Sequence, residues 1–305
     1  MILYFAGNVG GFRHKESAMV SAGAYNNLIT YSDVKQKRLQ MDLYFAGAEA
    51  FKKVLEEMNT TKELFSYYHL PKSRAEDLFE RPRKIFLDSG GFSAFTQGAA
   101  IDIDEYCNFI KKYEPQITHY AQLDCIGDEE GTVRNLKYME SKGLKPLPVF
   151  HFKGDFKRLE ALVKEYDYIC LGGLVPLSKA KPVLMAHLDK CFSIIKDKCK
   201  VHGFGMTGMD ILKRYPWYSV DSTSWIEASR RATHYEFRNG QMTMIPTSDP
   251  KKATYKSIGF SGKKKGLWRL RLIHSIKEWL KLEGFVTKLW YKKGINFTIT
   301  KTIEI

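Results

Sequence analysis

Residues 84–92, with the sequence KIFLDSGGF, join a short apolar run to an acid and a pair of glycines. A short apolar run bounded by turn-forming residues predicts a buried β-strand, as found in parallel sheets. Asp88 then stands at the end of this strand, where Gly90 and Gly91 let the backbone take a positive φ or pass close to a ligand. The segment therefore indicates both a parallel sheet and a candidate site at its edge.

The same pattern recurs along the chain. Other apolar runs lead into an acid, a histidine or glycines at residues 120–124, 147–151, 168–174, 201–205 and 217–223. Strands that alternate with helices predict a parallel sheet. If the strands close into a (β/α)₈ TIM barrel, all of these endings lie on its C-terminal rim, where such enzymes keep their chemistry. The sequence thus predicts an α/β fold of this type.

Nine runs qualify as strands, one more than an eight-stranded barrel needs. They lie near residues 2–6, 28–31, 42–46, 84–88, 118–124, 147–151, 167–171, 200–204 and 217–221. One early run is therefore expected to be a loop or a hairpin. Helices are predicted between the runs, at residues 48–58, 103–113, 131–142, 156–165 and 182–196.

Composition sets limits on the class of protein. The chain has 305 residues, enough for one large α/β domain and an appendage, and its 44% hydrophobic and 27% charged residues are typical of a globular protein. A net charge of +14 favours a polyanionic partner such as nucleic acid. The alternative is that the lysines simply face water.

The sequence also bears on location. It has no run of 18 or more apolar residues, so no membrane-spanning helix is expected. The N-terminus lacks the basic leader of a signal peptide. Five scattered cysteines without CxxC spacing indicate a reducing compartment, which predicts a cytoplasmic protein without a zinc site.

Composition changes after about residue 245, which divides the chain into a predicted barrel domain, residues 1–245, and a basic C-terminal extension, residues 246–305. Within the extension, Leu267, Leu270, Ile273, Ile276 and Leu280 form an apolar stripe at helical spacing. A basic helix carrying tryptophans could hold phosphates and stack on bases. Alternatively, it docks on the barrel and its lysines face solvent. The predicted nucleic-acid contacts are Lys263, Lys264, Lys265, Trp268, Arg269 and Arg271.

The order of the strand ends resembles the tRNA-guanine transglycosylase superfamily, whose members exchange a guanine for a 7-deazaguanine base. The family motifs match an Asp-Ser-Gly-Gly-Phe strand end at residues 88–92, Asp124, Gly-Gly-Leu at 172–174, Gly-x-Gly at 203–205 and a final Asp221. The resemblance covers residues 80–225 and implies a TIM barrel.

The resemblance also implies roles for the acids. Asp221 would be the nucleophile that attacks C1′, and Asp88 the general acid and base. Asp124 would accept hydrogen bonds from the N1–H and exocyclic amine of guanine. From the residues alone, Asp88 and Asp124 could equally be turn or cap residues. The other predicted base contacts are Ser89, Gly90, Gly91, Phe92, His151, Gly172, Gly173, Gly203 and Met206. This chemistry requires no metal and no redox cofactor.

Two departures distinguish the chain from the tRNA enzymes. No cysteine follows Cys199, so their zinc motif is absent, and Ser222-Thr223-Ser224-Trp225 replaces their basic stretch after the nucleophile. The chain therefore looks more like a divergent branch, found in phages and bacterial gene clusters, that acts on DNA. The implied partners are DNA and a free 7-deazaguanine base such as preQ0, in the host cytoplasm if the chain is phage-encoded.

Two alternatives remain open: the same exchange on tRNA, and a non-catalytic nucleic-acid-binding barrel. A metal-dependent barrel hydrolase is less well supported, because the chain has no His-x-His strand end.

Overall fold

The computed structural model describes residues 41–230, 233–246 and 267–295. The strands predicted at residues 2–6 and 28–31, and the predicted contacts Lys263, Lys264 and Lys265, lie outside the described residues. The described residues all belong to one compact unit, which begins at Gln40.

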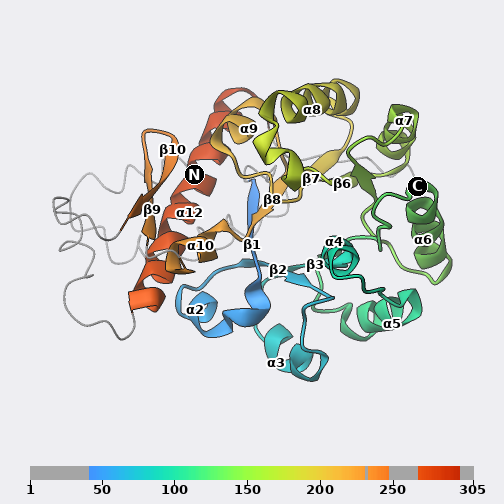
Figure 1. The fold of residues 1–305 in the computed structure, drawn as a ribbon, viewed down its shortest axis with the longest axis horizontal. Coiled ribbons are helices and arrows are strands. Elements are labelled where there is room, and N and C mark those ends of the chain that lie inside the picture. Colours follow the sequence, from blue (N-terminus) through green and yellow to red (C-terminus); the bar gives the residue numbers. More distant parts are fainter. Residues whose placement is uncertain (1–40, 231–232, 247–266, 296–305) are drawn as a thin grey trace, which may run out of the picture. The chain divides into compact units, whose positions relative to one another are not determined.

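Eight parallel strands form the centre of this unit, and helices lie around them (Figure 1). The strands are β1 (Asp42–Ala46), β2 (Lys62–Ser66), β3 (Lys84–Asp88), β4 (His119–Tyr120), β5 (Val149–His151), β6 (Tyr168–Gly172), β7 (Lys200–Gly203) and β8 (Ser219–Ser222). Their order in the sheet is β4-β3-β2-β1-β8-β7-β6-β5. The two end strands meet through a parallel bridge between Ala121 and Leu147, where the Leu147 N–H donates to the Tyr120 carbonyl at 2.8 Å. The predicted (β/α)₈ barrel fold is confirmed.

Helices follow the strands along the chain. They are α2 (Lys52–Glu57), α3 (Ala75–Phe79), α4 (Gly91–Thr96), α5 (Ile103–Tyr113), α6 (Glu129–Ser141), α7 (Phe156–Glu165), α8 (Lys181–Ile195), α9 (Met209–Arg214) and α10 (Ser224–Arg230), with short 3-10 helices η2 (Ala48–Ala50), η3 (Lys72–Arg74) and η4 (Val175–Lys179). Asp102, Asp128 and Asp155 cap α5, α6 and α7, each accepting a backbone N–H in the first turn. Helices α5 and α7 have the predicted bounds.

The strand prediction missed one strand of the barrel. Seven predicted runs, from residues 42–46 onward, coincide with barrel strands, but β2 was not predicted. Its sequence, KELFS, begins with two charged residues that are nevertheless buried. Lys62 pairs with Glu283 at 2.7 Å, and Glu63 pairs with Arg83 at 2.7 Å. The charges can be buried because each has a partner elsewhere in the fold, which the local pattern does not reveal.

The C-terminal segment contributes to the barrel's outer layer. Strands β9 (Thr233–Arg238) and β10 (Gln241–Pro246) form an antiparallel hairpin, and α12 (Leu267–Lys292) packs against β9 and α10. The predicted apolar stripe was only partly right: Ile276 is buried, but Leu270 and Leu280 are each 39% exposed. The buried face instead consists of Leu272, Ile276, Trp279, Leu282, Val286 and Trp290.

Polar contacts attach α12 to the barrel. The Leu43 N–H of β1 donates to Glu283 Oε1 at 2.7 Å, and the Trp290 indole donates to the Leu212 carbonyl at 2.8 Å. The barrel interior has its own small core, formed by Tyr44, Ala46, Leu64, Phe86, Ala121, Val149 and Cys170. This core underlies the carboxyl ends of the strands. In the described ranges, no helix is both long and apolar enough to span a membrane.

Candidate active site

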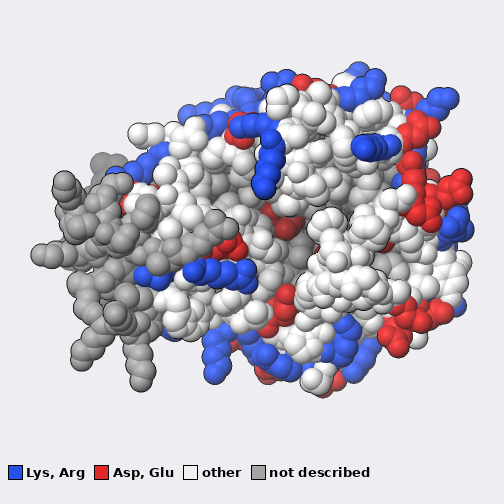
Figure 2. Space-filling view, in the orientation of Figure 1, with Lys and Arg blue, Asp and Glu red and all other residues white. Residues whose placement is uncertain are grey.

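Residues from the ends of five strands, β3, β4, β6, β7 and β8, line one cavity of about 310 Å³. Asp88 ends β3, Asp124 follows β4, Gly172 ends β6 and Asp221 lies in β8. The cavity is therefore at the carboxyl ends of the strands, the rim where barrel enzymes carry their active sites. Figure 2 shows the molecule hollowed near the centre of this face, with acidic atoms in the floor of the hollow.

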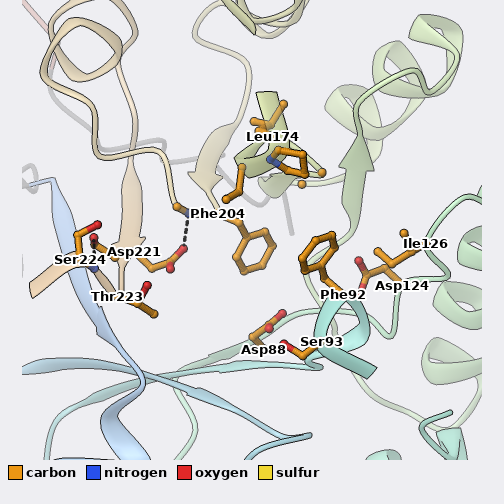
Figure 3. Close-up of a pocket in the computed structure, with 16 residues that line it drawn as sticks. Asp88, Phe92, Ser93, Asp124, Ile126, Leu174, Phe204, Asp221, Thr223 and Ser224 are labelled. Carbon is orange, nitrogen blue, oxygen red and sulfur yellow. Dashed lines mark hydrogen bonds between the residues drawn. The ribbon is translucent and has the colours of Figure 1, made fainter. Parts of the chain in front are cut away.

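Asp221 is held from the backbone of the β7–α9 loop. The Gly205 N–H donates to Asp221 Oδ1 at 2.9 Å (Figure 3). Gly205 has a φ of +69°, and a Cβ there would lie 2.6 Å from Val175 Cγ2. The left-handed backbone therefore favours glycine at this position, and any larger residue would also have to displace the Val175 side chain.

A buried histidine lies behind Asp221. The His202 side chain is fully buried, with Nε2 3.4 Å from Asp221 Oδ1. Its Nδ1 is 2.5 Å from Ser219 Oγ, which is also 2.5 Å from the Tyr168 hydroxyl. The imidazole stacks on Phe86, with ring centroids 4.4 Å apart. These contacts fix the ring, so His202 presents one nitrogen toward the carboxylate of Asp221.

Asp88 sits at the turn that starts α4. Its Oδ2 accepts the Gly90 N–H at 3.1 Å. Burial, and then the negative charges of Asp124 and Asp221, raise the pKa of Asp88 to about 8. Burial disfavours a charged carboxylate, and neighbouring carboxylates disfavour it further. At neutral pH, Asp88 is therefore mainly the protonated acid.

Asp124 is engaged on both oxygens. Ser89 Oγ donates to Oδ1 at 3.0 Å, and His151 Nε2 is 2.8 Å from Oδ2. Two glycines leave room for this arrangement. A Cβ on Gly91 would lie 2.6 Å from Asp124 Oδ1, and a Cβ on Gly172 would lie 2.9 Å from the His151 ring. The glycine pairs of the two strand ends therefore make space for Asp124 and for the histidine that supports it.

Two aromatic rings flank the middle of the cavity. Figure 3 shows Phe92, from α4, and Phe204, from the end of β7, with Asp88 below them. Asp221 lies on the Phe204 side and Asp124 on the Phe92 side. The backbone of Gly172, Gly173 and Leu174 lines another wall. Such a cavity suits a flat polar ring, which the phenyl groups can cover while the carboxylates bind its edges.

The predicted site residues fall into two groups. Asp88, Phe92, Asp124, Gly172, Gly173 and Asp221 line the cavity. The others lie behind it: Ser89 and His151 contact Asp124, Gly90 and Gly91 form the turn after β3, and Gly203 packs under Trp217.

Met206 was expected to cover the base, but it is buried in the core and does not line the cavity. Phe204 takes this place. Neither the role of Phe204 nor the contact between His202 and Asp221 was predicted from the sequence. The alternation along β7 could have indicated both residues, because His202 and Phe204 are two apart and residues two apart in a strand face the same side.

The predicted nucleic-acid contacts on α12 do not line this cavity. Trp268 is 50% exposed, and Arg269 forms an ion pair with Glu57 of α2. Arg271 is partly buried. Trp279 and Trp290 are buried in the barrel's outer layer, at 3% and 6% exposure.

Within the described part of the chain, no group of three or more His, Cys, Asp or Glu side chains is arranged to hold a metal ion. No protein-family model matches this chain, and no curated protein matches it significantly. Its function is therefore inferred from the site itself.

Proposed function

We propose that the chain is a base-exchange transglycosylase that replaces guanine in DNA with a 7-deazaguanine base of the preQ0 type. The observation that carries this proposal is the set of three carboxylic side chains in one cavity, of which Asp88 is mainly protonated at neutral pH. Base exchange requires both an acid that can release a proton to the leaving base and a carboxylate that can attack the sugar.

In the first half-reaction, an Asp221 oxygen attacks C1′ of the target nucleotide. The C1′–N9 bond breaks, its electron pair passes to the leaving guanine, and guanine takes up the proton of Asp88. The result is a covalent glycosyl–Asp221 ester and an ionised Asp88. The Gly205 N–H holds Asp221 in place for this attack, and His202 Nε2 lies 3.4 Å from the same carboxylate oxygen.

In the second half-reaction, the 7-deazaguanine occupies the position that guanine has left. Asp88 accepts its N9 proton, N9 attacks C1′, and the ester bond to Asp221 breaks. Both aspartates then return to their starting states. Two displacements at C1′ retain the configuration of the sugar, as in retaining glycosidases, which use two carboxyl groups in the same way.

Asp124 supports the choice of a guanine-like base. A carboxylate only accepts hydrogen bonds, and the N1–H and exocyclic amine of guanine form a pair of donors on one edge. His151 and Ser89 hold Asp124 from behind, so its orientation is set before the base binds. A cavity of about 310 Å³ is at the small end of ligand pockets, which span roughly 300–1,000 Å³, and suits one base between Phe92 and Phe204.

We propose DNA as the polymer because the chain departs from the tRNA enzymes in two ways. No cysteine follows Cys199, and the residues after Asp221 are not basic. The target nucleotide must leave its stack, because its C1′ and base edge are not accessible within a duplex.

An exchange assay tests the proposal. The full chain is incubated with free preQ0 and with DNA or tRNA that carries labelled guanine. We expect labelled guanine to be released from DNA, and nucleoside mass spectrometry to find the 7-deazaguanine in that DNA. Release from tRNA alone would contradict the choice of polymer. Asp221→Ala should abolish release and retain nucleic-acid binding, whereas a non-catalytic binding barrel would show no release from the unaltered chain.

A further inference from the structure

A second cavity, of about 670 Å³, lies next to the candidate active site. Gly205 and Ser224 line both cavities, so the two meet beside Asp221. The walls of the second cavity come from the start of α8, from α9, from the β9–β10 hairpin and from α12. The C-terminal hairpin and helix thus help to form a cavity beside the proposed nucleophile.

The second cavity carries positive charge and neutral hydrogen-bond donors. Its lining includes Lys181, Lys213, Thr207 and Gln241. The Lys181 ammonium is 2.5 Å from Asp210 Oδ2, so much of its charge is balanced. The Lys213 ammonium lies 5.8 Å from the centroid of the Phe285 ring, and among the described residues it has no acidic partner within salt-bridge distance. Figure 2 shows Lys and Arg side chains reaching toward the central hollow from the region of α8 and α9.

The geometry of a nucleotide indicates which of its groups would reach the second cavity. If the base lies between Phe92 and Phe204 with its edge at Asp124, its C1′ must be near Asp221, on the other side of the first cavity (Figure 3). The phosphates leave the sugar on the side away from the base. That direction leads past Gly205 and Ser224 into the second cavity.

We propose that the second cavity binds the phosphodiester backbone next to the exchanged nucleotide, with Lys213 as its principal cation. This inference rests on the proposed function, because the path of the phosphates follows from the proposed positions of the base and sugar. Lysine, serine, threonine and glutamine side chains are the groups that proteins use to bind phosphate oxygens without reading sequence. Asp210 opposes the binding, because it neutralises Lys181.

The test measures the binding of a fluorescent single-stranded DNA oligonucleotide by anisotropy across a range of salt concentrations. It uses the full chain, Lys213→Gln and Asp210→Asn. The matched control is Lys164→Gln, at an exposed lysine of α7 that lines neither cavity. Circular dichroism melting checks that every variant is folded.

Loss of one phosphate contact on a single strand lowers the slope of log K against log salt by about 0.7. We expect this change for Lys213→Gln, together with several-fold weaker binding at low salt. Asp210→Asn should bind several-fold more tightly, because Lys181 is released. Lys164→Gln should match the unaltered chain. Equal slopes for Lys213→Gln and Lys164→Gln would overturn the inference, as would weaker binding by Asp210→Asn.

The two proposals can fail separately. If the unaltered chain exchanges guanine in DNA but Lys213→Gln keeps the full salt slope, the second cavity does not bind phosphate and the proposed function stands. If Lys213→Gln lowers the slope but the unaltered chain releases no guanine from DNA or tRNA, the phosphate site stands and the transglycosylase proposal fails.

Discussion

The raised pKa of Asp88 leads to a prediction about the pH dependence of the first half-reaction. Guanine release requires Asp88 in its protonated form, since the acid gives its proton to the leaving base. With a pKa of about 8, the protonated fraction is about 90% at pH 7 and about 10% at pH 9. The single-turnover rate of guanine release should therefore fall about tenfold between these pH values.

The cause of the raised pKa of Asp88 can be tested independently of the size of the increase. Burial is its largest cause, followed by the negative charge of Asp124. Asp124→Asn removes that charge and keeps the shape of the side chain, so the pKa of Asp88 should fall. The alkaline limb of the pH–rate profile should then move to lower pH, whatever happens to the affinity for the base. Asp88→Asn should lower the rate by about 10²–10⁴-fold, as expected for loss of a general acid.

The assay is rapid-quench measurement of labelled guanine released from DNA, with enzyme in excess, from pH 6 to pH 10. Enzyme excess isolates the first half-reaction from product release. An alkaline limb that stays at the same pH in Asp124→Asn would refute the electrostatic part of the reasoning. A rate independent of pH across this range in the unaltered chain would refute the role of Asp88 as the acid.

Three further predictions concern the support of the site and of the fold. Gly91→Ala places a methyl group 2.6 Å from Asp124 Oδ1, so kcat/KM for guanine exchange should fall at least tenfold, while Gly284→Ala, with no atom within 4 Å, should keep full activity. Ser219→Ala removes the group that bonds His202 Nδ1, so the single-turnover rate should fall while oligonucleotide affinity, measured by anisotropy, stays the same. Glu283→Ala leaves Lys62 without its closest acidic partner, and urea unfolding should show a loss of about 3–5 kcal/mol. The exposed pair gives the control, since Glu57→Ala should cost at most about 1 kcal/mol.

The barrel could be predicted from the sequence because most of its strands are apolar runs with a clear end. Residues 84–88 are a strand with the predicted bounds, and the run predicted at residues 167–171 is a strand at Tyr168–Gly172. Strand β2 could not be predicted in the same way, because the ion-pair partners that allow Lys62 and Glu63 to be buried, Glu283 and Arg83, lie more than 15 residues away. Most of the buried face of α12 was not predicted, for a similar reason. The helix carries apolar residues on more than one side, and contact with the barrel decides which of them are buried.

The strand-end acids could also be predicted to converge, since a closed parallel sheet brings the carboxyl ends of all its strands to one rim. The contacts that determine their chemistry could not. His202 lies in a run of apolar and glycine residues, and its contact with Asp221 depends on the pairing of β7 with β8. A sequence shows which residues end each strand, but it does not show which side chains face one another across the barrel.

The glycine pairs show how this limit affects a functional interpretation. From the sequence, Gly91 was expected to take a positive φ or to let the backbone pass close to a ligand, and Gly172 was expected to contact the base. In the structure, Gly172 does line the cavity, but each glycine also gives up space to a polar side chain from a neighbouring strand end, Asp124 for Gly91 and His151 for Gly172. The two glycines therefore leave space for the two members of the same Asp124–His151 pair. A substitution at either glycine should affect the carboxylate proposed to read the base edge, even though the glycines themselves carry no chemistry.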